Sequence, residues 1–285
     1  MSLRPVVPAA PEAIELDLFL DALHRCHHYD FRSYSRNSLM RRADLARQRL
    51  GYATLSELQG RLLRDASILP DIIDAMTVQV SEFFRDPDYF LTLRRDVLPH
   101  LRTFPSIKVW VAGCADGEEL YSLAIMLEEE GLLDRTLFYA TEINRRALAR
   151  AEAGIYPIDR MALFSRNYQQ AGGRGSLSDH YTAAYGRAVF HRRLRARTVF
   201  TEHNLATDQV FSEVQLISCR NVLIYFDNNL QQRAIGLFAE ALARGGFLGL
   251  GLHETLRFST HAEAFAPFDE NRRIWRRTAL DMTHA

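Results

Sequence analysis

The chain has 285 residues, of which 47% are hydrophobic and 25% charged, and these proportions are typical of a soluble globular protein. Its formal net charge is 0 at pH 7, so overall charge favours no class of partner. No apolar run reaches the roughly 18 residues of a membrane span, and residues 1–11 lack a signal-peptide pattern, so we expect no membrane insertion. The three cysteines are widely spaced, which indicates a cytoplasmic protein rather than a disulfide scaffold.

The first part of the chain is predicted to form a small all-helical domain over residues 12–80. Leucine and isoleucine side chains recur there at helical spacing, and Gly51 ends the second of three predicted helices. A group of histidines and one cysteine at a predicted helix end is crowded rather than spaced like metal ligands, so we predict no metal site: His24, Cys26, His27 and His28.

The helical domain also carries a basic stretch in which Asp44 is the only acid. Its arginines are Arg32, Arg36, Arg41, Arg42, Arg47 and Arg49. This pattern indicates either a solvated helix face or a docking surface for an acidic helix, since arginine is well suited to paired recognition of carboxylates. We expect the partner to be a protein and not a nucleic acid.

From residue 107 onward, short apolar runs alternate with helical patterns. The runs cover residues 107–112, 137–140, 198–201, 214–218 and 247–252, and a further edge strand is expected at 273–276. Such alternation predicts an α/β fold with a parallel, doubly wound, Rossmann-like sheet, here over residues 81–280. Ligands of these sheets bind at the carboxyl ends of the strands, where the polar clusters of this chain stand.

One segment, residues 155–197, interrupts the alternation of strands and helices. It begins after a predicted helix and contains the glycine-rich stretch 172–176, followed by aromatic and basic residues. A connection of this length indicates either an inserted subdomain with a function or a flexible loop.

The first polar cluster follows the apolar run 107–112. Gly113 and Gly117 favour a sharp turn that lets the backbone approach a ligand, although a purely structural turn has the same pattern. Glu118 and Glu119 then stand at a helix start. The helix dipole favours acids there, and an acid at this place could also bind the amino group of a cofactor.

Further polar residues follow the later strands. Glu142 is predicted to accept hydrogen bonds from both hydroxyls of a ribose, unless it only caps the helix that follows. Asn204 and Leu205 come after the third run, and Arg220 and Asn221 after the fourth. Each pair is either part of a ligand site or a loop that satisfies its own backbone.

Two more residues have open interpretations. Arg85 follows the apolar pair Phe83 and Phe84 and is either a site residue or half of a surface ion pair. Tyr225 is either a site residue or a core tyrosine with its hydroxyl at the surface.

Taken in order, the segments 77–86, 112–119, 140–144 and 219–226 resemble the CheR family of S-adenosylmethionine-dependent methyltransferases, and the resemblance extends over about residues 11–277. The chain departs from the family pattern by Gln79 in place of Asn, Ser81 in place of Thr and Glu142 in place of Asp. In this family a small antiparallel subdomain occupies the place of the 155–197 insertion.

The resemblance implies an enzyme that methylates glutamate side chains of a chemoreceptor or related signalling protein and releases S-adenosylhomocysteine. It implies that Arg85 and Tyr225 hold and orient the acceptor carboxylate. The cofactor-binding residues that it implies are Gln79, Ser81, Arg85, Gly113, Glu118, Glu119, Glu142, Asn204, Leu205, Arg220 and Asn221. The expected partner is the acidic helical methylation region of the receptor. A methyltransferase with another acceptor and a non-catalytic cofactor-binding regulator stay open as alternatives.

Overall fold

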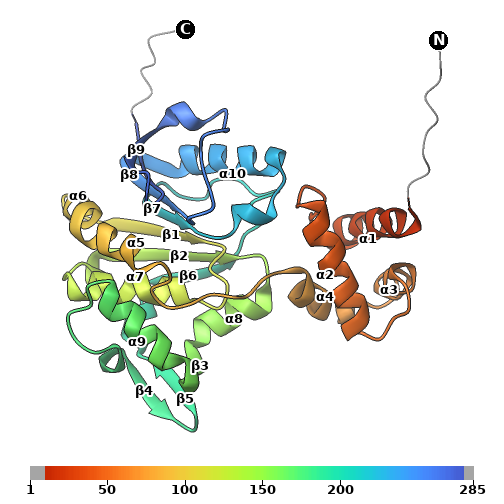
Figure 1. Ribbon diagram of the computed structural model, residues 1–285, viewed down its shortest axis with the longest axis horizontal. Helices are drawn as coiled ribbons and strands as arrows, with labels where there is room; N and C mark the ends of the chain where they lie inside the picture. Colours follow the sequence, from red (N-terminus) through yellow and green to blue (C-terminus); the bar gives the residue numbers. More distant parts are fainter. Residues whose placement is uncertain (1–9, 279–285) are drawn as a thin grey trace. The chain divides into compact units, whose positions relative to one another are not determined.

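The computed structural model describes residues 10–278, and the chain divides into two compact units (Figure 1). The helical unit contains the chain up to Val78 together with Tyr225–Asp227, and the sheet unit contains Gln79–Ile224 and the chain from Asn228 onward. The predicted domain boundary near residue 80 stays a prediction. The return of the chain to the helical unit at Tyr225 was not predicted.

The helical unit is built around two pairs of packed helices. It contains α1 (Pro11–His27), α2 (Arg36–Arg49), α3 (Leu55–Leu62), the 3₁₀ turn η1 (Ala66–Ile68) and α4 (Leu69–Met76). α1 packs against α3 and α2 against α4. Leu16, Phe19, Leu58 and Ile72 are completely buried between them, so the amphipathic spacing seen in the sequence produces the core.

Residues 225–227 join the helical unit through backbone pairing. Tyr34 and Phe226 form an antiparallel bridge, and their rings meet edge to face with centroids 4.8 Å apart. Ser35 N–H donates to the Tyr225 carbonyl at 2.8 Å, and Asp227 N–H donates to the Ser33 carbonyl at 2.9 Å. The position of the Tyr225 backbone is therefore set by the segment between α1 and α2.

The sheet unit contains a seven-stranded sheet in the order β6-β2-β1-β7-β8-β10-β9. Its strands are β1 (Ile107–Ala112), β2 (Thr136–Glu142), β6 (Thr198–Glu202), β7 (Val214–Cys219), β8 (Leu242–Leu250), β9 (Phe265–Asp269) and β10 (Ile274–Arg277). The strands from β6 to β8 are parallel, while β10 is antiparallel to both β8 and β9. The predicted Rossmann-like sheet is confirmed.

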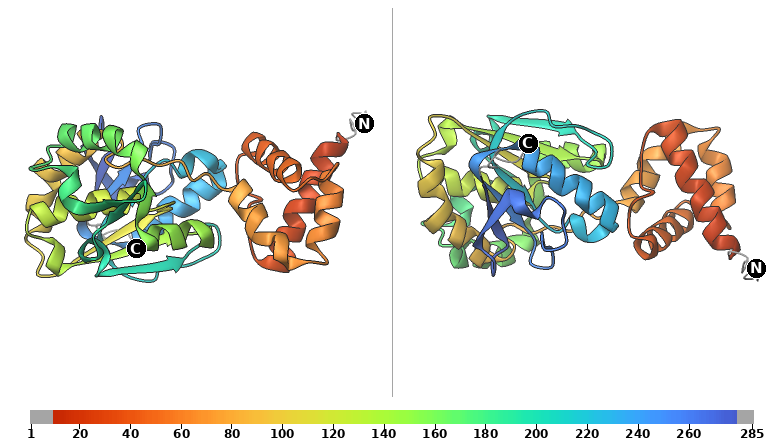
Figure 2. Two further views of the ribbon diagram at one scale, coloured as in Figure 1. Left: turned by 90° about the horizontal axis from the view of Figure 1, so that it is seen from below. Right: turned by 90° about the horizontal axis from the view of Figure 1, so that it is seen from above.

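Helices cover both faces of this sheet. They are α5 (Pro87–Thr92), the π-helical η2 (Leu93–Val97), α6 (Leu98–Leu101), α7 (Glu118–Glu129), α8 (Arg145–Ala153), α9 (Met161–Gln170) and α10 (Asn228–Ala241), with 3₁₀ turns η3 (Leu133–Arg135), η7 (Leu223–Tyr225) and η8 (Ala262–Ala264). Right-handed crossovers that run in opposite directions from the β1–β7 junction place α7 and α8 on one face and α10 on the other. The views from below and from above agree with this arrangement (Figure 2).

The insertion forms a small subdomain with its own three-stranded antiparallel sheet, β3-β5-β4. Its elements are β3 (Ile155–Pro157), η4 (Ile158–Arg160), α9, η5 (Leu177–His180), β4 (Tyr181–Ala184), β5 (Arg187–Phe190) and η6 (Arg192–Arg195). Phe83 stacks on Phe190 of this subdomain with ring centroids 4.5 Å apart, so the insertion shares the core of the sheet unit. The predicted antiparallel insertion is confirmed.

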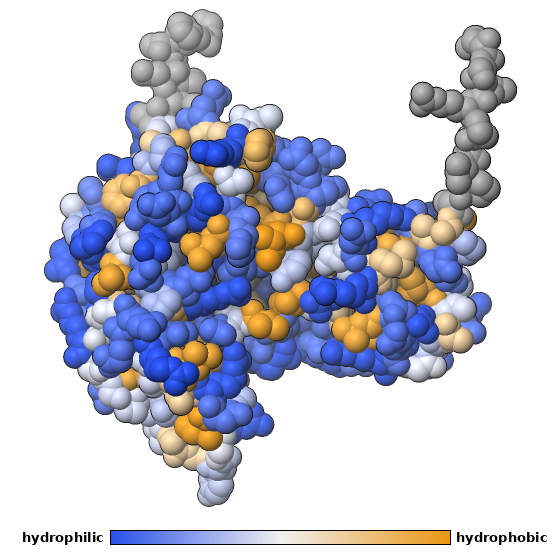
Figure 3. All heavy atoms as spheres, viewed as in Figure 1, coloured by the Kyte–Doolittle hydropathy of each residue, from blue (hydrophilic) through white to orange (hydrophobic). Residues whose placement is uncertain are grey.

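The face drawn in Figure 3 carries apolar side chains scattered among hydrophilic ones. Among residues 10–278, no helix is both long and apolar enough to span a membrane.

Candidate functional site

The site lies where the strand order reverses, between the carboxyl ends of β1 and β7. Gly113 and Gly117 have φ of 71° and 97°, a region that glycine enters without strain. A Cβ on Gly113 would lie 2.6 Å from Cγ2 of Val222, which follows β7. The absence of a side chain at Gly113 therefore lets the loops after β1 and β7 come together, as expected at the ligand-binding edge of a doubly wound sheet.

Glu118 is an acid at this edge with one carboxylate oxygen that makes no hydrogen bond among the described residues. Its side chain is 2% exposed, and its buried Oε2 has no hydrogen-bond partner among residues 10–278. The nearest cation is the Arg160 guanidinium, whose Nη1 lies 3.7 Å from Oε1. Burial raises the pKa of Glu118 to about 7. A cationic amino group would satisfy the free oxygen and stabilise the carboxylate.

Glu119, the other acid at the start of α7, is already engaged. It accepts hydrogen bonds from the Ser218 hydroxyl and from Nη1 of Arg220, the latter at 3.1 Å. The two adjacent glutamates, which the sequence could not distinguish, therefore differ in their hydrogen bonding. Glu118 is available to a ligand, and Glu119 stabilises the contact between α7 and β7.

Glu142 ends β2 and is buried. Its Oε2 accepts from Ala115 N–H at 3.1 Å, and its Oε1 accepts from the N–H groups of Ile143 and Asn144 at 2.9 and 3.1 Å. About three of its roughly four lone-pair positions are thus used, which leaves one for a ribose hydroxyl. Burial raises the pKa of Glu142. The Asn144 side chain, not Glu142, caps α8.

Arg220 is an internal cation rather than an open ligand for the cofactor. Its side chain is 1% exposed and pairs with Asp86 at 2.6 Å and Glu119 at 3.1 Å. It also donates to the Arg85 carbonyl and lies over the Tyr89 ring, 4.2 Å from the centroid. The guanidinium therefore joins the loop after β7 to the segment before α5.

Asn221 follows in a left-handed conformation with φ of 60°, and its Oδ1 is buried without a hydrogen-bond partner among the described residues. Gln79 has the same property at its Oε1. Both are acceptors that stay unsatisfied within residues 10–278. A buried acceptor of this kind indicates a donor that comes from a ligand.

The segment around Arg85 is held in an unusual backbone conformation. Phe84 and Asp86 have φ of 51° and 56°, and Phe84 N–H donates to the Ser122 hydroxyl at 2.9 Å. Both phenylalanines of the segment are buried, as predicted. The Arg85 guanidinium is half-buried and makes no hydrogen bond or ion pair within the described part of the chain. Ser81, further upstream, accepts from Arg160 through its carbonyl at 2.8 Å.

Asn204 and Leu205 lie after β6 and are nearly buried, at 8% and 7% exposure. The Asn204 Oδ1 accepts from Ala206 N–H at 2.9 Å, which forms a turn. The side-chain NH₂ group of Asn204 has no partner among residues 10–278, so this is the group that can face a base. The loop interpretation and the ligand interpretation are thus compatible.

Tyr225 belongs to the helical unit, whereas the other predicted site residues belong to the sheet unit. Its ring is half-buried, and its carbonyl is bound by Ser35 N–H. The prediction that Tyr225 orients an acceptor remains a prediction.

Several residues of this edge were missed in the sequence. Asp86 and Ser218 complete the Arg220 and Glu119 network, and Arg160 of the insertion lies beside Glu118. Glu254 accepts four backbone hydrogen bonds from the loops after β7 and β8. It follows the carboxyl end of a strand, as the predicted clusters do, so the same signal could have found it.

The site fits S-adenosylmethionine. The partnerless acceptors Glu118 Oε2, Gln79 Oε1 and Asn221 Oδ1 belong to residues predicted to bind it. The ligand offers an ammonium group, two ribose hydroxyls and an adenine amino group as donors, and these groups need acceptors from the protein. No group of histidine, cysteine, aspartate and glutamate side chains suited to a metal ion occurs in residues 10–278.

Known proteins are similar to this chain in sequence. The chain is 50% identical over 265 residues to Cher3 of Pseudomonas putida, covering 93% of this chain and 97% of that protein. It is 34% identical over 210 residues to a chemotaxis protein methyltransferase of Listeria monocytogenes, covering 72% and 76%. The solved glycopeptide N-methyltransferase MtfA complexed with S-adenosyl-L-methionine is 13% identical, with a TM-score of 0.36 and coverage of 61% of this chain and 51% of that chain.

Two family descriptions match the two parts of the chain. Residues 14–77 match the all-alpha domain of the CheR methyltransferases, and residues 79–273 match their S-adenosylmethionine-binding domain. The second match covers most of the chain and includes all the residues predicted to bind the cofactor or the acceptor. This chain therefore belongs to the CheR methyltransferase family and carries its S-adenosylmethionine-binding domain.

Proposed function

We propose that this chain transfers the methyl group of S-adenosylmethionine to glutamate side chains of a chemoreceptor or related signalling protein, forming methyl esters. Membership of the CheR family supports the methyl transfer. The relatives named chemotaxis protein methyltransferases support a chemoreceptor as the substrate. The glutamate oxygen as the acceptor is the finer part of the proposal and is argued from the site.

The observation that best supports a carboxylate as the methyl acceptor is that the Arg85 side chain is unpaired among the described residues. Its guanidinium makes no hydrogen bond or ion pair within residues 10–278, whereas the neighbouring Arg220 is paired with two carboxylates. A guanidinium can bind a carboxylate through two parallel hydrogen bonds, which fixes its orientation as well as its position. Arg85 is thus the cation of this edge that is available to an anionic acceptor.

The chemistry needs orientation more than acid–base catalysis. A glutamate side chain has a pKa near 4.3 and is already ionised at neutral pH, so no general base has to remove a proton. Bound S-adenosylmethionine supplies an electrophilic methyl group on a sulfonium. Arg85 would hold the carboxylate in line with that methyl group, and Tyr225 is the second residue that we propose to orient it. Because pairing also stabilises the anion, these residues must position it while one lone pair stays free.

The helical unit offers a surface for the acidic receptor helix. Three of the six arginines of its basic stretch, residues 32–49, are paired with acids: Arg32 with Asp30, Arg36 with Asp17 and Arg47 with Asp44. Arg41, Arg42 and Arg49 make no ion pair within the described residues. The unpaired arginines are therefore the ones available to an external carboxylate.

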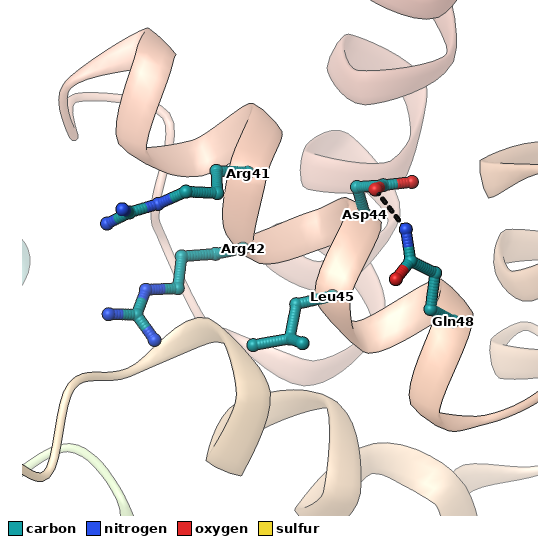
Figure 4. A pocket seen from close by; sticks show the side chains of 5 residues that line it. All are labelled: Arg41, Arg42, Asp44, Leu45 and Gln48. Atoms are coloured by element: carbon teal, nitrogen blue, oxygen red, sulfur yellow. Dashed lines mark hydrogen bonds between the residues drawn. The ribbon is translucent and has the colours of Figure 1, made fainter.

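A hollow of about 400 Å³ lies along α2 and is lined by Arg41, Arg42, Asp44, Leu45 and Gln48. Arg41 and Arg42 extend from the helix in the same direction, while Asp44 and Gln48 are joined by a hydrogen bond on another side (Figure 4). Burial and the neighbouring Arg41 lower the pKa of Arg42. The carboxylate of an acidic partner would favour the charged guanidinium and so act against this lowering.

One assay separates this proposal from its alternatives. Purified protein is incubated with tritiated S-adenosylmethionine and with a receptor methylation fragment, with RNA or with neither. Base-labile counts on the receptor fragment are expected. Base-stable counts, or counts on RNA, would point to another acceptor. Cofactor binding without transfer to any of them would indicate a regulator.

A further inference from the structure

Glu254 lies in the turn after β8 and contacts the loop after β7, residues 220–224. Its Oε1 accepts from the N–H groups of Val222 at 2.9 Å and Ile224 at 3.3 Å. Its Oε2 accepts from the N–H groups of Asn221 at 3.0 Å and Gly251 at 2.6 Å. One side chain thus binds four backbone groups from two loops that are distant in sequence.

The Glu254 carboxylate has no capacity left for a ligand. A carboxylate has about four lone-pair positions, and four donors occupy them here. The side chain is also 4% exposed. Unlike Glu118, which keeps one oxygen without a partner, Glu254 can act on the reaction only through the groups it holds.

Those groups belong to the candidate site. Asn221 has φ of 60° and a buried Oδ1 without a partner among the described residues. Val222 lies against Gly113, whose Cβ, if present, would be 2.6 Å from Cγ2. Ile224 directly precedes Tyr225. The conformation of this loop therefore sets an acceptor that faces the cofactor, a contact with the glycine loop and the starting point of the Tyr225 segment.

We propose that Glu254 is a positioning residue for methyl transfer: its carboxylate fixes the 220–224 loop so that Asn221 faces the cofactor and Tyr225 begins from a defined place. The turnover part of this inference rests on the proposed function. The part about loop conformation and cofactor affinity does not, because both can be measured without any methyl acceptor.

The closeness of Gly251 provides a second way to disturb the same contact. A Cβ on Gly251 would lie 2.8 Å from Asn221 N and 2.9 Å from Oε2 of Glu254. Gly251→Ala would therefore force Asn221 or the Glu254 carboxylate to shift, and so disturb their contact without removing the carboxylate. Glu254→Gln replaces one oxygen by an NH₂ group, which cannot accept, so backbone N–H groups on that side lose their partner.

The test uses the full chain with Glu254→Gln, Gly251→Ala and, as a matched control, Asp179→Asn. Asp179 also accepts a backbone hydrogen bond, from Ser176 N–H at 2.9 Å, but lies in the insertion. Amide hydrogen exchange is measured first. We expect faster exchange at Asn221, Val222 and Ile224 in both loop variants, with unchanged protection at Val109 and Val111 of β1. The control should leave the loop amides as they are in the wild type.

Calorimetry with S-adenosylhomocysteine should then show about tenfold weaker binding in both loop variants and no change in the control. With the receptor fragment, kcat should fall by roughly 10²-fold, the order expected for a misplacement of about 1 Å. Wild-type exchange and affinity in either loop variant would overturn the inference. If exchange and affinity change as expected but the wild type esterifies no receptor, the proposed function fails and the positioning role stands. If one loop variant does not fold, the other decides.

Discussion

At the scale of single residues, the acids of the strand ends differ in how much of each carboxylate the protein uses. Glu142 and Glu254 accept three and four backbone hydrogen bonds, and Glu119 binds a hydroxyl and a guanidinium. Glu118 keeps an oxygen without a partner in residues 10–278. Four glutamates at one edge of the sheet thus differ in how much hydrogen-bond capacity they keep for a ligand.

Glu118 should make cofactor affinity depend on pH. Its pKa is raised to about 7 by burial, so below that pH the side chain is increasingly protonated and cannot attract a cationic amino group. Affinity for S-adenosylhomocysteine should therefore fall by roughly tenfold from pH 8 to pH 6, in proportion to the ionised fraction. Calorimetry across this range measures it. Glu118→Gln should bind more weakly and lose this pH dependence; the same slope in the variant would assign the titration to another group.

Glu142→Ala should weaken S-adenosylhomocysteine binding by roughly 1–3 kcal/mol, because a charged hydrogen bond to the ribose is lost. It should also lower the free energy of unfolding, since the N–H groups of Ala115, Ile143 and Asn144 lose their acceptor. Calorimetry and thermal unfolding report the two effects separately. Glu202→Ala, at the paired position on β6, is the control and should keep full affinity. Equal affinities of the wild type, Glu142→Ala and Glu202→Ala for S-adenosylhomocysteine would exclude the ribose contact.

Tyr225→Phe removes one hydroxyl and leaves the backbone pairing with Ser35 intact. If the hydroxyl orients the acceptor, kcat should fall by about tenfold while cofactor affinity stays at the wild-type value. Initial rates with the receptor fragment and calorimetry together test this. Tyr52→Phe in the same unit should change neither quantity. Normal turnover in Tyr225→Phe would show that the hydroxyl has no part in the reaction.

At the scale of elements, α2 is the helix whose surface the structure makes testable. Arg41 and Arg42 line its hollow and make no ion pair within the described residues. Replacing both by Glu should raise the KM for the receptor fragment by at least about tenfold and weaken its dependence on salt, because surface charges steer an acidic partner. S-adenosylhomocysteine affinity should not change.

The control for α2 is the double variant Arg166→Glu and Arg244→Glu, which makes the same change in net charge at exposed positions of the sheet unit. It should leave the receptor KM near the wild-type value. If both double variants raise KM equally, the effect comes from overall charge and α2 is not the docking surface for the receptor. If neither does, α2 is a solvated face.

The parallel strands could be predicted from the sequence because their signals are local, whereas β9, α5, α6 and the fourth helix of the helical unit were not predicted. Apolar runs marked the parallel strands, and polar residues at their ends marked the site, since a strand end in such a sheet is also a ligand-binding edge. What each polar residue does could not be predicted. That Arg220 pairs with Asp86, that Glu119 meets Ser218 and that Glu254 binds the 220–224 loop depends on contacts across the sheet. Such contacts join residues that are distant in the sequence, so the spacing of residues along the chain does not indicate them.

At the scale of the whole molecule, cofactor binding and acceptor orientation should be separable. The predicted cofactor residues belong to the sheet unit, whereas Tyr225 belongs to the helical unit. A chain that begins at Gln79 lacks Ser33–Ser35, to which Tyr225–Asp227 pairs. We expect it to bind S-adenosylhomocysteine within a few-fold of the full chain and to methylate the receptor fragment at a small fraction of the rate. Calorimetry and tritium transfer on the two chains measure this, and loss of cofactor binding in the shorter chain would contradict it.

The bridge between Tyr34 and Phe226 also bears on how such proteins can be recombined. A chimera made by exchanging everything before Gln79 with a relative would bring a foreign partner to Phe226 and Tyr225. For such a chimera to stay active and to take on the receptor preference of the relative, residues 225–227 should have to be exchanged together with the helices. Over generations the two distant segments should change together, because neither can be inherited alone without disturbing the other.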